Sequence, residues 1–398
     1  MDTLVMDTIL ALIGTVIREE NASEDLKNAL TPEAIESLFE ESKHHDVTHI
    51  VAEALDRMGL LLEDDLSERY QMERMYAIYR YQRTNYELQQ ICKIFERARV
   101  KFIPLKGSVL REYYPEPWMR TSCDIDVLVQ KEDLERATEL LVGELKYINR
   151  GQASPHDIAL VSQSDIHVEL HYDTIEEGRA GQANEILSHV WDYAAPVEGA
   201  QWHHALSPEI FYFYHVAHMA KHFEYGGCGI RFFLDLWILD QRMSYDRTLC
   251  DELLEKSGLL SFANAARDLS DCWFSGRELD QTGLAMQQYV LQNGIYGEMD
   301  TRMMIYQSRH SSKLAYIWSR MFWPYDRMKL KYPILQKHKW LTPFMHIRRL
   351  FWLLRRDQRK RGMHELSLQS GESKKEAQAT LNLMRKLGLQ SDGEKPDA

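Results

Sequence analysis

The chain has few cysteines, no long apolar run and no excess of basic residues, and each absence excludes a class of protein. Its five cysteines include no CxxC pair, which argues against a disulfide framework and a cysteine zinc site, so a reducing cytoplasm is the expected location. No uncharged apolar run approaches the roughly 20 residues that cross a bilayer. The apolar start carries Asp2 and Asp7 where a signal peptide would have basic residues, so we expect an amphipathic helix there.

The acidic charge balance limits the partners. With 60 acidic and 48 basic residues the net charge is −12, whereas sequence-independent nucleic-acid binding needs a basic surface. We therefore do not expect a nucleic-acid partner. A hydrophobic content of 44 % in 398 residues is ample for a globular protein of two or three packed units.

The apolar spacing predicts where helices and strands lie. Helical spacing dominates the first hundred residues and includes a long helix over about 67–98. We expect the tyrosines of this helix to pack inward; they are Tyr76, Tyr79, Tyr81 and Tyr86. Short β-like runs then follow, with one helical stretch between the second and the third.

This pattern predicts an α+β fold, in which a small mixed β-sheet is flanked by N-terminal and C-terminal helical regions. The second half of the chain returns to helical spacing, and its last hundred residues are basic and aromatic before a polar tail. The predicted regions are residues 1–98, 99–175, 176–298 and 299–398.

The segment 102–129 carries the residues with the clearest chemistry. Asp124 and Asp126 are two apart in an apolar strand, so their carboxylates face one side, where they repel each other unless a cation lies between them. Lys106, Gly107 and Ser108 stand where a strand gives way to a helix, a position that attracts phosphate. A phosphate site beside a two-carboxylate metal site is the layout of an enzyme that handles a nucleoside triphosphate.

These residues resemble the nucleotidyltransferase superfamily, the polymerase-β-like fold, whose signature is a Gly-Ser turn, Asp-x-Asp and a later carboxylate. The runs LKG, YYPEP and DIDVLV, together with Arg120, are similar to a narrower bacterial family of uncharacterised nucleotidyltransferases. That family shares the long gap between Ser108 and Asp124. The resemblance is strongest over residues 95–175.

The resemblance implies transfer of a nucleoside monophosphate from a triphosphate to a hydroxyl group, with Mg²⁺ or Mn²⁺ as the metal. We expect ATP as the donor and AMP as the transferred group. The acceptor stays open between a small molecule or sugar and a protein side chain, and the sequence leaves the oligomeric state and the base preference open as well.

The resemblance also implies a third carboxylate on a neighbouring strand. Glu169 in the run HVELH matches it, as a metal ligand beside Asp124 and Asp126 and as the group that accepts the proton of the attacking hydroxyl. Asp165 and Asp173 are weaker substitutes because they lie at the strand ends. On alternation His167 and His171 share the face of Glu169. A competing histidine–carboxylate metal site is therefore possible here.

Two residues of the turn and two cationic residues are candidates for phosphate contacts. Gly107 and Ser108 are expected to bind the β- and γ-phosphates, because glycine allows close backbone approach and serine offers a hydroxyl. Lys106 either adds a charge there or is a solvated lysine. Arg120 either contacts phosphate or makes a surface salt bridge.

A later helix carries His215, His218 and His222 on one face. They could bind a metal, although core or network histidines are commoner. The narrower family has a similar His-x-x-Lys-His helix followed by Arg and Asp, matched here by Lys221, Arg231 and Asp235, which implies a lining of the nucleotide or acceptor cleft. A simpler explanation is an ion pair between Arg231 and Asp235, four residues apart.

The basic stretch 329–361 contrasts with the acidic chain. It is either a docking surface for an anionic membrane, tRNA or phosphorylated substrate, or the solvated side of a helix whose Phe351, Trp352 and Leu353 pack inward; we favour the second. Two rival functions remain: a catalytically silent nucleotide-binding interaction protein, and a histidine–carboxylate metal hydrolase.

Overall fold

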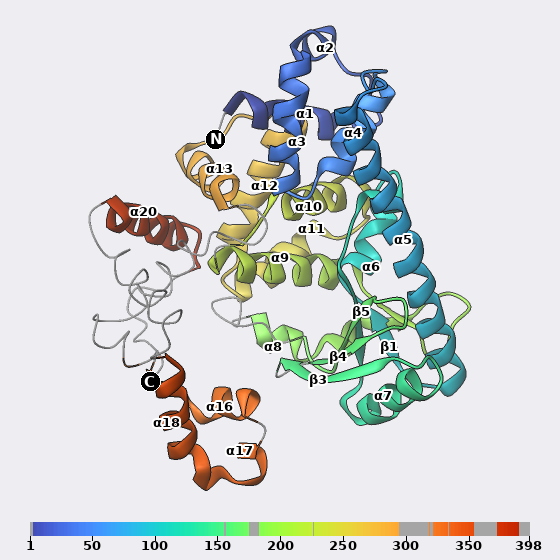
Figure 1. Cartoon of the computed structure of the whole chain (residues 1–398), viewed down its shortest axis with the longest axis vertical. Helices are drawn as coiled ribbons and strands as arrows, with labels where there is room; N and C mark the ends of the chain where they lie inside the picture. Colours follow the sequence, from blue (N-terminus) through green and yellow to red (C-terminus); the bar gives the residue numbers. More distant parts are fainter. Residues whose placement is uncertain are drawn as a thin grey trace. The chain divides into compact units, whose positions relative to one another are not determined.

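The computed structural model describes residues 3–154, 157–174, 183–225, 227–293, 318, 321–332, 334–353 and 372–389 (Figure 1). The chain divides into two compact units. The first comprises Met1–Tyr296 with Leu387–Leu389, and the second comprises Gly297–Lys386 with Gln390–Ala398. The finer division into four regions stays a prediction.

The first unit contains the predicted small mixed sheet, which confirms the α+β fold class. Its strand order is β1-β2-β5-β4-β3. The central pair β2 and β5 is parallel, and the other neighbouring pairs are antiparallel. The strands are β1 (Phe102–Pro104), β2 (Asp124–Val129), β3 (Ile148–Ser154), β4 (Asp157–Val161) and β5 (His167–His171).

The alternation of residues along β2 gives the sheet two different faces. Ile125 and Val127 point into a buried apolar cluster with Val168 and Leu170 of β5. Helices α5 (Asp65–Ala98) and α7 (Leu134–Gly143) cover this face with the apolar side chains Ile91, Ile94, Phe95, Ala137 and Leu141. The opposite face is left with the acidic residues of β2 and β5.

Helix α5 connects the sheet to the N-terminal helices, and Figure 1 shows it running from these helices past the strands. It begins at the cap Asp64, whose carboxylate accepts the Ser67 N–H at 2.8 Å, and it ends at Arg99 in the left-handed conformation. The preceding helices are α1 (Thr3–Ile17), α2 (Glu24–Ala29), α3 (Pro32–His44) and α4 (Thr48–Arg57).

Three of the four tyrosines of α5 that were expected to pack inward are exposed. Tyr76, Tyr79 and Tyr86 are 59 %, 57 % and 61 % exposed, so the inward packing predicted for them is wrong. The buried stripe of α5 includes the aliphatic Ala77, Ile91 and Ile94 together with the aromatic Tyr70 and Phe95. Tyrosine tolerates this exposure because its hydroxyl stays in water.

Helices follow the sheet, as the spacing predicted. Ser207 caps the first long one through Ile210 N–H, and Pro208 occupies its first position. The helices are α8 (Asn184–Leu187), α9 (Pro208–Glu224), α10 (Ile230–Arg242), α11 (Arg247–Lys256), α12 (Leu260–Ser275) and α13 (Gln281–Asn293).

A small two-stranded sheet, β6 (Ala194–Pro196) and β7 (His204–Leu206), lies within the region predicted to be helical. The segment before β7 covers the free edge of β1, since Phe102 N–H donates to Trp202 O at 3.0 Å. Glu96 of α5 accepts the N–H groups of Gln201, Trp202 and His203, which fixes this segment to the helix. The edge of the main sheet is thereby protected.

The described part of the second unit is helical. Its elements are α16 (Tyr325–Lys331), α17 (Ile334–Lys337), the 3-10 turn η6 (Lys339–Leu341), α18 (Thr342–Leu353) and α20 (Glu372–Lys386). Phe351 is 70 % exposed, so its predicted inward packing is wrong, and Trp352 is also exposed; the side chain of Leu353 lies outside the described set. None of the helices in the described ranges has the length and apolarity that a bilayer crossing requires.

Candidate active site

Three side chains of the central strand pair meet on the face of the sheet that α5 and α7 leave open. In the parallel register Asp126 lies opposite Glu169, and Leu128 lies opposite His171. Ligand atoms of Asp126, Glu169 and His171 all lie within 4.8 Å of one another. Glu169 therefore lies on the strand beside the Asp-x-Asp motif, and its role as the third carboxylate of the site stays a prediction.

Asp126 is the centre of this cluster. Its Oδ1 accepts hydrogen bonds from Lys106 Nζ at 2.7 Å and from His171 Nε2 at 2.8 Å. His171 Nε2 also lies 3.4 Å from Glu169 Oε2. The Asp126 side chain is only 4 % exposed. A carboxylate this buried needs such partners, because an uncompensated buried charge is costly.

The surroundings separate the two aspartates electrostatically. Burial and the neighbouring Asp126 carboxylate raise the pKa of Asp124 to about 6. Burial pushes the pKa of Asp126 upward as well, but the Lys106 ammonium and the His171 hydrogen bond outweigh it and hold this pKa below its usual range. Burial lowers the pKa of His171, and hydrogen bonds with Asp126 and Glu169 raise it overall to about 9. The pKa values of Asp124 and Asp126 therefore differ, although their carboxylates share one strand face.

The donor set fits a divalent cation. Asp126 and Glu169 supply the hard carboxylate oxygens that Mg²⁺ and Mn²⁺ prefer, and Asp124 lies two residues along the same strand face. Asp124 is not among the converging atoms of the described residues. The imidazole of His171 is a ligand better suited to Mn²⁺ or Zn²⁺ than to Mg²⁺.

The turn between β1 and α6 (Gly107–Leu110) is strained and tightly packed. Lys106 has φ +47° and ψ −122°, a conformation that non-glycine residues rarely adopt and that costs about 1–3 kcal/mol. A Cβ on Gly107 would lie 3.1 Å from Ser122 Cβ, so any larger residue here would force its neighbour to shift by a few tenths of an ångström. Strain of this kind is common at functional sites.

Ser108 presents a buried hydroxyl. Its Oγ has no hydrogen-bond partner among the described residues, while its N–H donates to Leu105 O at 3.2 Å. A buried hydroxyl without a partner is unusual in proteins, and a ligand oxygen would satisfy it. The backbone N–H of Ser108 is therefore already paired within the turn.

Arg111 supports the turn, and sequence reasoning missed it. Its Nε donates to Gly107 O at 2.9 Å and its Nη2 donates to Ser122 Oγ at 2.8 Å. Ser122 Oγ in turn donates to Asp124 O at 3.2 Å. Arg111 therefore connects the Gly-Ser turn to the start of β2. Its position four residues after Gly107 in a short helix was the only available signal.

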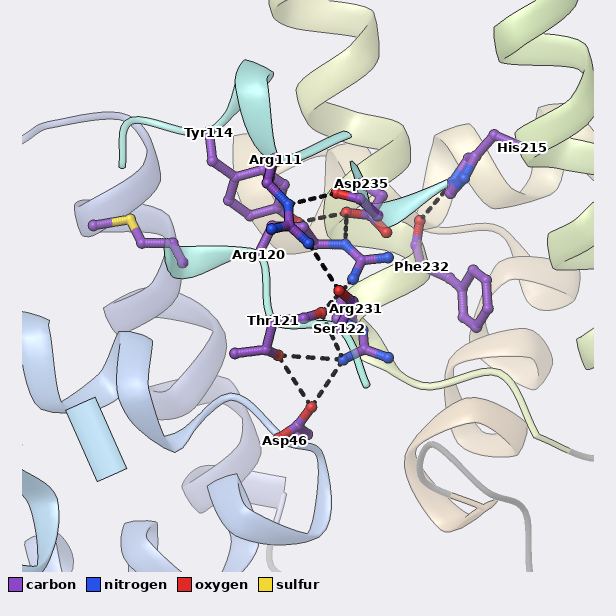
Figure 2. Close-up of polar contacts among 12 residues, drawn as sticks. Asp46, Arg111, Tyr114, Arg120, Thr121, Ser122, His215, Arg231, Phe232 and Asp235 are labelled. Carbon is purple, nitrogen blue, oxygen red and sulfur yellow. Dashed lines mark hydrogen bonds and ion pairs between the residues drawn. The ribbon is translucent and has the colours of Figure 1, made fainter. Parts of the chain in front are cut away.

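Arg120 lies in a buried ion pair, so the alternative of a surface salt bridge is wrong. Its Nε donates to Asp235 Oδ1 at 2.7 Å, and Tyr114 Oη donates to the same oxygen at 2.7 Å (Figure 2). Asp235 is fully buried on α10. The Tyr-Pro and Arg insertion thus joins the turn to a helix far along the chain. The phosphate contact expected for Arg120 stays a prediction.

Arg231 pairs with another partner than the one expected. Its Nη1 donates to Asp46 Oδ2 at 2.8 Å and lies 3.3 Å from Thr121 O, as Figure 2 shows. An intrahelical pair between Arg231 and Asp235 is therefore wrong, because Asp235 turns to Arg120. Asp46 stands between α3 and α4, so the N-terminal helices are tied to the loop before β2. The sequence could not show this contact, which joins distant segments.

Helix α9 contributes an aromatic and basic edge. Tyr214 is close enough to Lys106 to raise the pKa of this lysine, although burial opposes the shift and Asp126 contributes more. His218 and Lys221 lie four and seven residues further on, and therefore on the same face; both are half-buried. The predicted cleft-lining role of Lys221 stays a prediction.

The three histidines of α9 do not converge on one point. His215 is buried, and its Nε2 lies 3.4 Å from Phe232 O (Figure 2). His218 Nε2 and His222 Nε2 are 3.1 Å apart. Among the described residues the only metal-competent cluster is that of Asp126, Glu169 and His171, so the histidine triplet is not part of one. His167, on the face of Glu169, is exposed.

Comparison with known proteins agrees with this arrangement. No curated protein and no solved structure matches the chain significantly. One family model does match, described as "Uncharacterised nucleotidyltransferase", over residues 31–275. The match spans more than half of the chain and includes the turn, both aspartates, Glu169, Arg120, Arg231 and Asp235. The chain therefore belongs to the uncharacterised nucleotidyltransferase family.

Proposed function

We propose that the protein transfers the nucleoside monophosphate of a triphosphate, with ATP as the preferred donor, to a hydroxyl of an acceptor. One observation carries the proposal: Asp126 and Glu169 face each other on parallel strands, next to a strained Lys-Gly-Ser turn. Carboxylates at this spacing, with a phosphate site beside them, serve in-line displacement at phosphorus.

The acceptor oxygen forms a bond to the α-phosphorus, the bond from this phosphorus to the oxygen bridging to the β-phosphate breaks, and pyrophosphate leaves. Glu169 accepts the proton of the attacking hydroxyl. Asp124, Asp126 and Glu169 would hold Mg²⁺ or Mn²⁺. When bound, the metal neutralises charge on the phosphates.

The turn binds the leaving phosphates. The buried Ser108 hydroxyl donates to a phosphate oxygen and thereby gains the partner it lacks within the described chain. Lys106 supplies a charge beside Asp126, and Gly107 keeps the turn close to Ser122. Arg111, Arg120 and Arg231 act as positioning residues, because the structure uses their donors to hold the loop before β2.

The face of α9 that carries the buried Tyr214 and the half-buried His218 and Lys221 is our candidate for the acceptor side. Tyr214, His218 and Lys221 share one helix face, and Tyr214 is electrostatically coupled to Lys106. The donor half of the reaction is therefore specified by the sheet and the turn, and the acceptor half by a helix. The hydroxyl acceptor itself is left to the assay.

The test measures pyrophosphate release and label transfer. The full chain is incubated with α-labelled ATP, CTP, GTP or UTP and Mg²⁺ or Mn²⁺, with panels of sugar, aminoglycoside-like and protein acceptors. Asp126→Asn should lower the rate by about 10³-fold or more, which is the order of losing one strong electrostatic contact to the transition state. Glu169→Gln should have a similar effect.

Asp165→Asn is the matched control. Asp165 lies just before β5 with φ +60°, a conformation that asparagine accepts well. The variant removes a carboxylate near the same strand and should keep full activity. Label transfer that survives in Asp126→Asn would overturn the assignment. Tight ATP binding without pyrophosphate release in the wild type would favour the silent nucleotide-binding protein.

A second candidate function rests on His171. Its Nε2 completes the converging cluster with Asp126 and Glu169, a donor set that also suits zinc. A histidine–carboxylate metal hydrolase would hold stoichiometric zinc after purification and would lose it in His171→Gln. The nucleotidyltransferase predicts weakly bound, exchangeable Mg²⁺.

A further inference from the structure

The second unit carries an exposed stripe of large apolar side chains on one helix. The aromatic stripe consists of Trp340, Phe344, Ile347 and Phe351, which are 69 %, 58 %, 52 % and 70 % exposed. Their spacings of four, three and four residues place them on a single face that runs from η6 along α18. The Trp340 and Phe344 rings touch edge to face at 6.3 Å between centroids.

The other face of α18 is already packed within its unit. Arg349 is 1 % exposed; its Nη1 donates to Met321 O at 2.8 Å, and its guanidinium lies over the Trp323 ring at 3.8 Å. Arg349 is nine residues after Trp340, which is half a turn away from the stripe on a helix of 3.6 residues per turn. Among the described residues of the second unit, the packed side of α18 is thus the one that carries Arg349, and the stripe lies on the opposite side.

The stripe lies in a basic stretch of the sequence, in a chain that is otherwise acidic. Residues 329–361 contain eleven Lys and Arg and one acidic residue, while the rest of the chain has 37 basic and 59 acidic residues. Lys337, Lys339 and Arg348 are exposed beside the stripe. The only strongly basic stretch of the protein thus coincides with exposed aromatic side chains.

We propose that η6 and α18 dock on an anionic lipid bilayer, with the aromatic stripe at the boundary between headgroups and acyl chains. Helices that lie in a membrane interface combine Trp, Phe and aliphatic residues on one face with Lys and Arg at its borders. Anionic headgroups attract such a polybasic segment. An otherwise acidic chain is repelled by the same surface, which confines contact to this segment.

A bilayer explains the stripe better than other anionic partners. Four apolar side chains in a line, one of them the aliphatic Ile347, present a continuous surface that lipid can cover. Single-stranded nucleic acid is bound through aromatic rings in a basic groove, and Ile347 offers no ring for such stacking. A second copy of the chain would place like charges of the two basic stretches together.

The test uses the full chain and vesicles of defined composition. Sedimentation with phosphatidylcholine vesicles is compared with vesicles that contain phosphatidylserine at about one third of the lipid. Binding to the anionic vesicles should be about tenfold tighter or more, and should weaken when the salt is raised from about 0.1 M to 0.5 M. Brominated lipids should quench tryptophan emission in the wild type, and less in Trp340→Phe.

Two double variants test whether vesicle binding depends on the aromatic stripe or on exposed aromatic side chains in general. Phe344→Ser with Phe351→Ser should lower the affinity for anionic vesicles about tenfold or more. Tyr76→Ser with Tyr79→Ser removes two comparably exposed rings from α5 and should leave it unchanged. Far-UV circular dichroism checks that each variant is folded.

Three outcomes would overturn the proposal. The first is an absence of vesicle binding by the wild type. The second is equal binding by the wild type and the Phe344→Ser, Phe351→Ser variant. The third is an interaction with RNA, measured by filter binding, or with a second copy, measured by light scattering. This interaction would depend on the stripe in a protein that does not bind vesicles.

Discussion

The buried pair of Arg120 and Asp235 makes a quantitative prediction about stability. Asp235 is fully buried, and its Oδ1 accepts from Arg120 Nε and Tyr114 Oη, each at 2.7 Å. Asp235→Asn preserves an oxygen acceptor but removes the charge that compensates the guanidinium. Removing one partner of a buried ion pair costs about 3–5 kcal/mol, whereas an exposed pair contributes about 0–1 kcal/mol. We expect a loss of about 3 kcal/mol in the free energy of unfolding.

Urea unfolding measures this loss. The midpoint is followed by far-UV circular dichroism and by tryptophan fluorescence, and the free energy is extrapolated linearly to water. If the two units unfold separately, the shifted transition should be that of residues 1–296. Glu24→Gln is the control, because its pair with Lys27 is exposed; it should change the free energy by less than about 0.5 kcal/mol.

A double variant tests the physical reason. Arg120→Met in the Asp235→Leu background removes the orphaned charge, and should recover part of the stability lost by Asp235→Leu alone. A loss below about 1 kcal/mol in Asp235→Asn would refute the reasoning. It would mean that water reaches the guanidinium, and Arg120 would then be free for the phosphate contact that the family resemblance implies.

Three further changes have defined outcomes. Gly107→Ala should destabilise by about 1–3 kcal/mol, because its Cβ would lie 3.1 Å from Ser122 Cβ. Gly143→Ala, whose added Cβ would meet no atom within 4 Å, should not lower the melting temperature; an unchanged Gly107→Ala variant contradicts this. Burial lowers the pKa of His215 to about 4. The neutral imidazole therefore adds about 3 kcal/mol to the free energy of unfolding above pH 6.5, and this stabilisation is lost as the pH falls toward 4. His215→Leu should flatten the dependence of the free energy of unfolding on pH over this interval, whereas His189→Leu, at an exposed position, should not. Tyr147→Phe removes a buried hydrogen bond to Glu87 and should cost about 1–3 kcal/mol in urea unfolding, unlike Tyr193→Phe at the surface.

The sequence was sufficient for features that depend on local periodicity and local chemistry. The alternation in DIDVLV and HVELH predicted two strands with their acids on one side, and the structure brings Asp126 and Glu169 together in register. The capped start of α9 at Ser207 and Pro208 was equally readable. Each of these depends on neighbours within one element.

The features that sequence reasoning missed depend on contacts between distant segments. The interaction of Arg231 with Asp46 joins α10 to the N-terminal helices, and a four-residue spacing to Asp235 pointed to the wrong partner. The exposure of Tyr76 and Tyr79 depends on which elements cover α5. The short strands β6 and β7 pair with each other, and the segment before β7 lies along the edge of β1, a contact between distant segments. Composition and spacing contain no information about these neighbours.

The parallel pairing of β2 with β5 also bears on how the protein is made. A parallel pair needs a crossover connection, here through α7, β3 and β4, so Asp126 leaves the ribosome long before its partner Glu169. Until β5 docks, Asp126 on the acidic face of β2 lacks its partner His171 and keeps Lys106. Contacts of such sequence separation form slowly. A nascent chain that ends before residue 167 lacks β5 and holds only the β2 part of the site, so the carboxylate pair is completed only after β5 has been made.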